Sequence, residues 1–295
     1  MAEQPPQYAI DAAEEFNRRF SSDSAVAVCG SSGATIEIEL SGNACSSCCL
    51  YDYVDDLILI LEARSECPHA VWRLDQPSPA EPRCRATIAR LGFLSEIARA
   101  AVAVGGTVDA RRREFESVRG SEDAVFSELC FCILTANYTA EGGIRIQRAL
   151  SRDFPAARRE ELAAKLKAMG HRFPNKRAEF ISEAQRLRGT LCSTLQCFAN
   201  GPDAREWLVE NVKGFGYKEA SHFLRNVGFK DVAIIDRHIL SYLAANGLID
   251  PKRTLTKRRY LEIELLLSAI AAKLGTTQAE LDLYIWYLKT GKVLK

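Results

Sequence analysis

The sequence lacks any apolar run that approaches the roughly 18 to 20 residues needed to cross a bilayer. Its start, Met-Ala-Glu-Gln-Pro-Pro, is not a secretory signal. It has no internal repeat, and it has no group of four closely spaced cysteines near its end that would hold an iron–sulfur cluster. We therefore expect a protein of the cytoplasm, in a reducing compartment.

Lysine is absent from the first hundred residues, which carry eight arginines and fifteen acidic residues, a balance of −7. Residues 101–295 carry 31 basic and 23 acidic residues, a balance of +8, although the whole chain has a net charge of only +1. A basic surface attracts polyanions. The C-terminal two-thirds is therefore the part suited to nucleic acid, although a charge of this size does not decide the matter alone.

Six of the ten cysteines fall in the first 84 residues: Cys29, Cys45, Cys48, Cys49, Cys67 and Cys84. A chain of this length without a secretory signal is not a disulfide miniprotein, which leaves reduced thiols or a metal. Cys45 and Cys48 have zinc-like C-x-x-C spacing, but Cys67 and Cys84 are single residues far apart. Free thiols are favoured, and we assign no metal site.

Residues 1–100 are predicted to form a small α+β lobe of unknown role. Its expected elements are a helix at Ile10–Phe20, strands at Ala25–Cys29, Thr35–Leu40 and Ala70–Leu74, and a helix at Tyr53–Ala63, before a proline-rich break at Gln76–Pro82. Residues 101–295 are predicted to form an all-α domain. The helices expected from Phe93 onward cover 93–104, 122–136, 142–152, 158–168, 174–188, 190–199, 203–212, 218–227, 237–246, 256–273 and 277–289.

The stretch from Val209 to Asn226 predicts two helices joined by a tight turn that contains Gly214 and Gly216. Glycine lets the backbone turn sharply and approach another surface, and the free N–H groups that open a helix suit a phosphate oxygen. This pattern therefore predicts a helix-hairpin-helix. We expect Lys213 and the two glycines to contact a DNA backbone.

Lys218 opens the second helix, and Asp236 follows eighteen positions later, at the end of an apolar run. The helix dipole and desolvation both favour a neutral amine at such a lysine, and a neutral amine can act as a nucleophile. Two simpler interpretations remain open: Lys218 contacts only a phosphate, and Asp236 caps the helix that begins at Arg237.

Two motifs carry a family resemblance: Lys213-Gly-Phe-Gly-Tyr-Lys218 and Ile234-Ile-Asp236 resemble the helix-hairpin-helix superfamily of DNA glycosylases. Three further segments resemble the archaeal-type second family of 8-oxoguanine DNA glycosylase/AP lyases. They are Glu128–Gly143, the loop Phe173-Pro-Asn-Lys-Arg177 and the ending Trp286–Lys295. The resemblance covers about residues 110–295, and the first hundred residues are an addition to it.

The resemblance implies a mainly α helix-hairpin-helix glycosylase fold and a bifunctional mechanism without a required metal or organic cofactor. Lys218 would attack C1′ of an extruded nucleotide and displace the base, and the Schiff base would permit β-elimination. Asp236 would position Lys218 and stabilise positive charge on the sugar. The implied partner is double-stranded DNA containing 8-oxoguanine, bound by a nucleoid-associated monomer.

The resemblance also suggests residues for base recognition. Asn137 would fill the gap left by the extruded base, or simply cap a helix. Trp286 would stack on a purine, although a tryptophan at this spacing is also typical of a core. Lys295, the last residue of the sequence, would reach into the base pocket and distinguish 8-oxoguanine from guanine.

Weaker assignments concern the DNA backbone and the surroundings of Asp236. His238 could contact a phosphate or pack near the site, and Arg172, Lys176 and Arg177 form a basic loop that could hold a phosphate or be solvated. Two alternative functions stay open at this point. One is a glycosylase/lyase for oxidised pyrimidines, and the other is a non-catalytic DNA-binding module.

Overall fold

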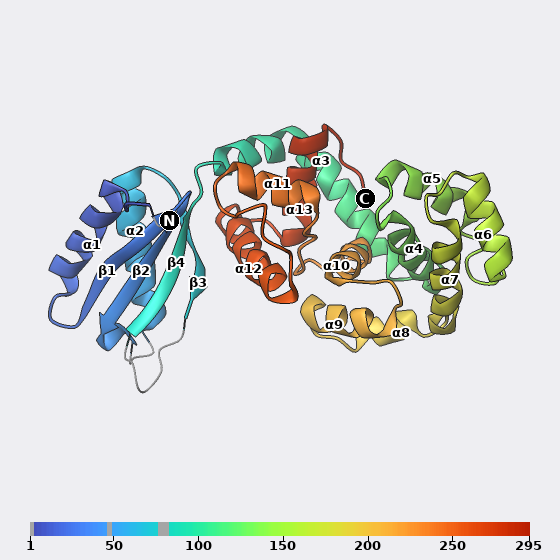
Figure 1. The fold of residues 1–295 in the computed structure, drawn as a ribbon, viewed down its shortest axis with the longest axis horizontal. Coiled ribbons are helices and arrows are strands. Elements are labelled where there is room, and N and C mark those ends of the chain that lie inside the picture. The colour runs from blue at the N-terminus through green and yellow to red at the C-terminus, as the bar shows by residue number, and fades with distance from the viewer. Residues whose placement is uncertain (1–2, 46–48, 76–82) are drawn as a thin grey trace. The chain divides into compact units, whose positions relative to one another are not determined.

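The computed structural model describes residues 3–45, 49–75 and 83–295. The chain divides into two compact units, which we call unit 1 and unit 2 (Figure 1). Unit 1 contains the described residues up to Ala100 together with Arg237–Thr276, and unit 2 contains Ala101–Asp236 together with Thr277–Lys295. Within the described ranges, no helix is both long enough and apolar enough to cross a membrane.

Unit 1 is built on an antiparallel sheet with the strand order β1-β2-β4-β3. Its strands are β1 (Ser24–Ser32), β2 (Thr35–Gly42), β3 (His69–Leu74) and β4 (Arg83–Arg90). The helices α1 (Gln7–Phe20) and α2 (Leu50–Ser65) pack against each other, and α1 also packs against β1 (Figure 1). Phe16, Leu40 and Ile88 are fully buried in this core, so the predicted α+β lobe is confirmed.

Strand β4 was not among the predicted elements, although it lies in the interior of the sheet. Its even positions Cys84, Ala86 and Ile88 are buried, while Arg83 and Arg85 are exposed, as the period of a half-buried strand requires. Alanine, which occupies two of its positions, is a weak strand former. The extended conformation of β4 therefore depends on its pairing with both β2 and β3 rather than on local propensity.

The segment 237–276 completes unit 1 with helices α11 (Arg237–Ala245) and α12 (Lys257–Lys273). Helix α12 lies alongside β3, where the indole Nε1 of Trp72 donates to the carbonyl of Glu262 at 2.7 Å. Lys273 also forms an ion pair with Glu62 at 2.7 Å. The division into a lobe of 1–100 and a domain of 101–295 therefore stays a prediction, because the compact units divide the chain differently.

Unit 2 is helical throughout its secondary structure. It contains most of α3 (Leu94–Val118) and all of α4 (Glu122–Thr135), α5 (Ala140–Leu150), α6 (Arg159–Ala168), α7 (Pro174–Ala184), α8 (Leu191–Gln196), α9 (Gly201–Asn211), α10 (Tyr217–Asn226) and α13 (Gln278–Thr290). Its core is a continuous cluster that includes Phe126, Phe131 and Phe223. The predicted fold class, mainly α with a small α+β lobe, is confirmed.

Helix α3 is longer than the predicted 93–104, because it runs through Gly105 and Gly106 to Val118. A glycine inside a helix costs only about 1 kcal/mol relative to alanine. Val108 and Phe115, beyond the glycines, pack with Leu283 of α13 in a separate buried cluster. The burial of Val108 and Phe115 offsets the cost of the two glycines. The helix therefore continues beyond residue 104, where its local sequence pattern weakens.

The cysteine-rich part of unit 1 shows conventional packing in its described residues. His69 is fully buried with its Nδ1 at 2.8 Å from the carbonyl of Cys67, and burial lowers the pKa of His69. The Cys45 thiol donates to the carbonyl of Leu40 at 3.2 Å. Cys48 lies outside the described residues, and among the described ones no three His, Cys, Asp or Glu side chains group to hold a metal ion.

Candidate active site

The hairpin joins α9 to α10 and depends on one glycine. Gly214 has φ +89°, and a Cβ there would lie 2.4 Å from the ring of Phe180. Gly216 has φ −104°, and a Cβ there would meet only the Glu219 carboxylate, at 3.4 Å. The left-handed conformation expected of a hairpin glycine is thus needed at Gly214 and not at Gly216.

Helix α10 presents Lys218 in its first turn while burying its opposite face. Ala220, Phe223 and Leu224 are fully buried in the core of unit 2. The Lys218 side chain keeps 32% of its surface exposed, and its Nζ lies 3.6 Å from Glu219 Oε1. The amphipathic helix therefore fixes the backbone of Lys218 and leaves its amine open to a ligand.

Asp236 is the last residue of unit 2 and follows the buried run 232–235. Its charge acts on Asp282 of α13, which is buried and paired with Arg225 of α10. Burial raises the pKa of Asp282 to about 6; Arg225 and Lys218 oppose this shift, and Asp236 adds to it. The charges of Lys218 and Asp236 thus both reach the same buried carboxyl group.

A second buried carboxylate, Glu128 of α4, accepts three hydrogen bonds. Gln147 Nε2 and Lys295 Nζ donate to Glu128 Oε1 at 2.9 and 2.5 Å, and Asn226 Nδ2 donates to Oε2 at 3.0 Å. Glu128 lies within one of the segments that carry the family resemblance, but the sequence alone predicted no role for it. A charged residue inside the apolar run 125–135 was the signal that could have found it.

Lys295 lies inside unit 2 rather than in a frayed tail, because its side chain is only 18% exposed. Its Nζ lies 4.7 Å from the centre of the Phe131 ring. Burial lowers the pKa of His222 well below its usual value, and the charges of Arg225, Lys218 and Lys295 add to that effect. Lys218 and Lys295 therefore act on one half-buried imidazole, which places both near the same part of unit 2.

Asn137 is exposed directly beyond α4 in the left-handed conformation, with φ +58°. The residues before it are held by the side chains of His171 and Arg177. His171 is buried, which lowers its pKa; its Nε2 donates to the carbonyl of Leu134 at 3.0 Å, and its Nδ1 accepts from the Phe173 N–H at 3.0 Å. Arg177 is also buried and donates to the carbonyl of Ala136 at 2.5 Å, so it does not belong to a solvated loop.

The remaining predicted residues are Trp286 and His238, which lie on two different helices, and three cations of the hairpin and the basic loop. Trp286 is half-buried one helical turn beyond Asp282 on α13, whereas His238 belongs to α11 in unit 1. The hairpin and loop cations engage neighbours: Lys213 pairs with Glu179 and Glu183, Lys176 pairs with Glu179, and Arg172 lies over the Phe173 ring. These cations would exchange such partners to bind a phosphate.

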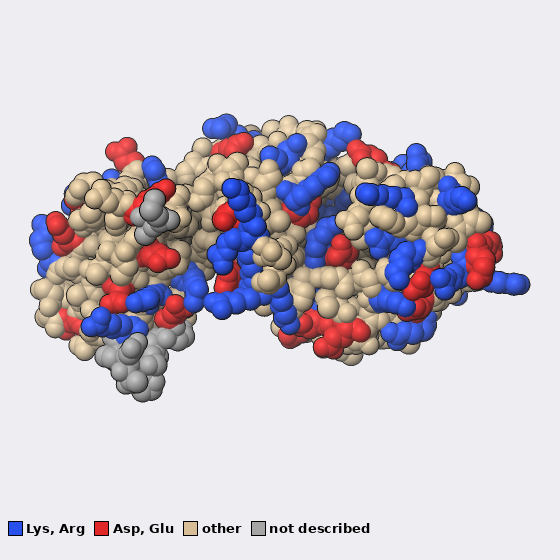
Figure 2. All heavy atoms as spheres, viewed as in Figure 1, with Lys and Arg blue, Asp and Glu red and all other residues tan. Residues whose placement is uncertain are grey.

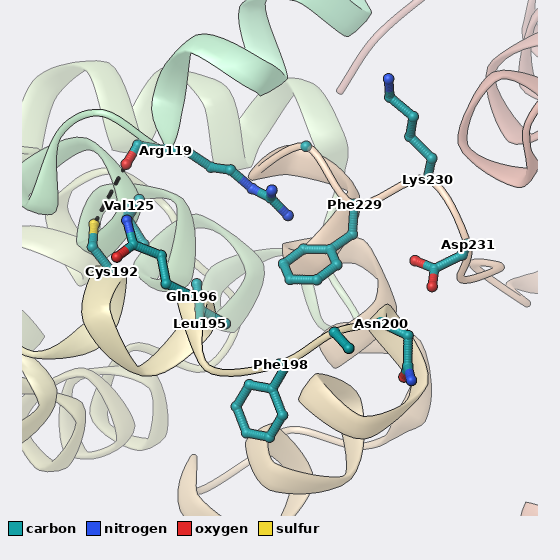
Figure 3. A pocket seen from close by; sticks show the side chains of 12 residues that line it. Arg119, Val125, Cys192, Leu195, Gln196, Phe198, Asn200, Phe229, Lys230 and Asp231 are labelled. Atoms are coloured by element: carbon teal, nitrogen blue, oxygen red, sulfur yellow. Dashed lines mark hydrogen bonds between the residues drawn. The ribbon is translucent and has the colours of Figure 1, made fainter.

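A cavity of about 430 Å³ opens elsewhere in unit 2 (Figure 3). Arg119 lies over the Phe229 ring at 4.1 Å there and donates to the carbonyl of Val227 at 2.6 Å. None of the predicted site residues lines this cavity. On the visible face of the molecule, basic and acidic side chains are interspersed (Figure 2).

The fold and the site together define a class: a helical core with a glycine hairpin, a lysine opening the second hairpin helix and an aspartate beyond it is the arrangement of helix-hairpin-helix DNA glycosylases. A family described as 8-oxoguanine DNA glycosylase matches residues 108–276. The chain belongs to this family. The resemblance stated from the motifs and the enzyme class that it implied, a DNA glycosylase that is also an AP lyase, are confirmed.

Curated relatives carry the name 8-oxoguanine DNA glycosylase/AP lyase. The protein of Methanocaldococcus jannaschii is 56% identical over 190 residues, which cover 64% of this chain and 91% of that protein. The protein of Thermotoga maritima is 45% identical over 207 residues, which cover 69% of this chain and 99% of that protein. About a third of this chain thus lies outside each match.

Solved structures agree with these matches. The crystal structure of the M. jannaschii 8-oxoguanine DNA glycosylase has a TM-score of 0.66 at 52% identity, covering 69% of this chain and 96% of that one. The M. jannaschii 8-oxoguanine glycosylase/lyase in complex with a 15mer DNA containing 8-oxoguanine has a TM-score of 0.67 at 51% identity, covering 69% and 99%.

The hairpin geometry predicts a loss of stability on replacing Gly214 with alanine. The new methyl group would meet Phe180 in a backbone conformation that alanine disfavours, so Gly214→Ala should lower the free energy of unfolding by about 1 to 3 kcal/mol. Gly216→Ala is the matched control and should change it by less than about 1 kcal/mol. Urea denaturation without DNA measures both, and equal losses in the two variants would contradict the account of the hairpin.

Proposed function

We propose that this protein removes 8-oxoguanine from double-stranded DNA through a Schiff base on Lys218 and then cleaves the strand by β-elimination. The observation that carries the proposal is the placement of Lys218, half-buried at the start of α10. Its charge and that of Asp236 act on one buried carboxyl group. The names of the relatives, and the DNA with 8-oxoguanine in one solved complex, support the choice of substrate.

The chemistry begins with extrusion of the lesion nucleotide, because a base stacked in a duplex cannot reach Lys218. The neutral amine attacks C1′, so that a bond from Nζ to C1′ forms while the glycosidic bond breaks and the base leaves with a proton. The sugar ring then opens to a Schiff base. Loss of a proton from C2′ expels the 3′ phosphate and breaks the strand.

Asp236 has an electrostatic role in this scheme. It lies at the end of a buried run, which fixes its backbone, and its carboxylate stabilises the positive charge that develops on the sugar as the base departs. It also favours the orientation of Lys218 that attack requires. A cap for α11, which begins at Arg237, is compatible with the same position.

Base recognition falls to residues of unit 2. Lys295 presents its ammonium over the Phe131 ring, where it reads the edge that separates 8-oxoguanine from guanine. Trp286 offers a ring face for stacking on the purine. Asn137, exposed in a left-handed conformation, fills the space that the extruded nucleotide leaves in the duplex.

The DNA backbone is contacted by the hairpin through Lys213, Gly214 and Gly216. Further contacts come from Arg172 and Lys176 of the basic loop and from His238, whereas Arg177, predicted with them, is buried and holds the carbonyl of Ala136. We also propose a monomer that acts in the reducing cytoplasm, at the nucleoid, with residues 101–295 as the glycosylase/lyase domain. Residues 1–100 are left without an assigned role.

Borohydride trapping tests the nucleophile. The intact protein should form a covalent adduct with an 8-oxoguanine duplex, and Lys218→Gln should abolish it because the amide cannot form a Schiff base. Lys213→Gln is the matched control in the same hairpin and should retain the adduct. A panel with thymine glycol and abasic duplexes fixes the substrate, and no adduct from the intact protein would favour a non-catalytic module.

Asp236→Asn should separate binding from chemistry. The amide keeps the shape but loses the charge, so base excision in a single turnover should slow by roughly 10²-fold to 10³-fold. Binding to a duplex with a non-reactive abasic analogue should stay within about 3-fold, since phosphate contacts dominate affinity. If affinity and excision fell together, Asp236 would be chiefly structural.

Lys295→Met should weaken discrimination between 8-oxoguanine and guanine by roughly 10-fold or more, because a buried donor to the base is lost. The measurement is the ratio of single-turnover excision rates on matched duplexes. Lys292→Met is the control, since Lys292 lies in the same tail and pairs with Glu141 where both side chains are 60% exposed. Unchanged discrimination in Lys295→Met would refute its assigned role.

A further inference from the structure

We propose that Glu128 is a positioning residue for base recognition, which holds Lys295 in the base pocket and couples it to the helix of the nucleophile. This inference rests on the function proposed above and extends it to a residue that has no role there. Its basis is geometric: one buried carboxylate of α4 contacts the lysine that reads the base and the last residue of α10.

Glu128 is an unusual residue for its position, because α4 is buried along nearly its whole length. Its side chain is only 9% exposed, between buried apolar neighbours such as Leu129 and Phe131. A buried carboxylate is costly unless it is paired and hydrogen-bonded. Two amides, from Gln147 and Asn226, supply neutral donors, and Lys295 supplies the cation.

The hydrogen bond to Glu128 uses only one of the N–H donors of the Lys295 ammonium. An ammonium has three N–H donors, and Glu128 Oε1 accepts one of them at 2.5 Å. The Nζ atom also lies 4.7 Å from the centre of the Phe131 ring, which attracts the cation without accepting a conventional hydrogen bond. Because Glu128 and Phe131 fix its position, the ammonium can direct a remaining donor toward a base without first becoming ordered.

The Glu128 carboxylate also connects Lys295 to α10 through hydrogen bonds. Asn226 donates to Glu128 Oε2, and its Oδ1 accepts from Arg225 Nε at 3.2 Å and Nη2 at 3.0 Å. Arg225 in turn pairs with Asp282, the carboxyl group on which the charges of Lys218 and Asp236 act. Glu128 thus links Lys295, the proposed base-recognition residue, to helix α10, whose first turn carries Lys218, the proposed nucleophile.

The experiment is excision by Glu128→Gln, which removes the charge but keeps the shape. Single-turnover release of 8-oxoguanine should fall roughly 10-fold to 100-fold, with a matching loss of discrimination against guanine, because a charge-assisted hydrogen bond is removed. Strand cleavage at a preformed abasic site needs no base recognition and should stay within about 3-fold. Glu141→Gln is the matched control, since it removes the exposed partner of Lys292, and it should change neither rate.

A double-mutant cycle with Lys295→Met tests whether Glu128 acts through Lys295. In the Lys295→Met background, Glu128→Gln should lower excision by less than about 2-fold further. Fully multiplicative effects, an equal loss of abasic-site cleavage, or unchanged discrimination in Glu128→Gln would each overturn the inference. Should Glu128→Gln fail to fold, Glu128→Asp keeps the charge but withdraws it by one methylene. A folded Glu128→Asp with intact discrimination would also overturn it.

The intact protein separates this inference from the function on which it rests. If the intact protein releases no 8-oxoguanine, the proposed function fails, and the role of Glu128 fails with it. If the intact protein discriminates against guanine and Glu128→Gln does so equally well, only the role of Glu128 fails.

Discussion

The burial of two carboxylates against one end of α10 is the constraint on which the site depends. Asp282 pairs with Arg225, and Glu128 accepts from Asn226, so the last two residues of the helix are each held by a buried acid. Unpaired, each of these groups would cost several kcal/mol. The Arg225–Asp282 ion pair therefore fixes the rotation and depth of α10, and with them the position of Lys218 in its first turn, while Glu128 links the same end of the helix to Lys295.

The hairpin contributes to the same positioning from the other end of the helix. Gly214 adopts a conformation that brings the backbone against the Phe180 ring, and the Glu219 carboxylate accepts from the N–H of Gly216 at 3.3 Å. The first turn of α10 is thus fixed by the backbone and the last turn by side chains. Lys218 retains freedom only beyond its Cα, which suits a nucleophile that must reach a sugar carbon.

The enzyme class was easier to predict from sequence than the internal contacts of the chain. Lys218 and Asp236, whose roles stay predictions, were singled out because a glycine hairpin and an apolar run are local patterns. Glu128, His171 and Arg177 contact Lys295, Leu134 and Ala136, which lie 37 to 167 residues away along the chain, and no local pattern encodes such contacts. Strand β4 escaped prediction for the same reason, since its partners rather than its own residues favour the extended form.

The docking of α12 beside β3 has a consequence for the first hundred residues as an isolated fragment. Because β3 is a terminal strand of the sheet, its outer N–H and C=O groups have no further strand to pair with among the described residues. In the full chain a helix from residues 257–273 lies alongside that strand. A fragment that ended near residue 100 would lack this helix, which is encoded more than 150 residues later, and would present the strand as a template for strand-to-strand association.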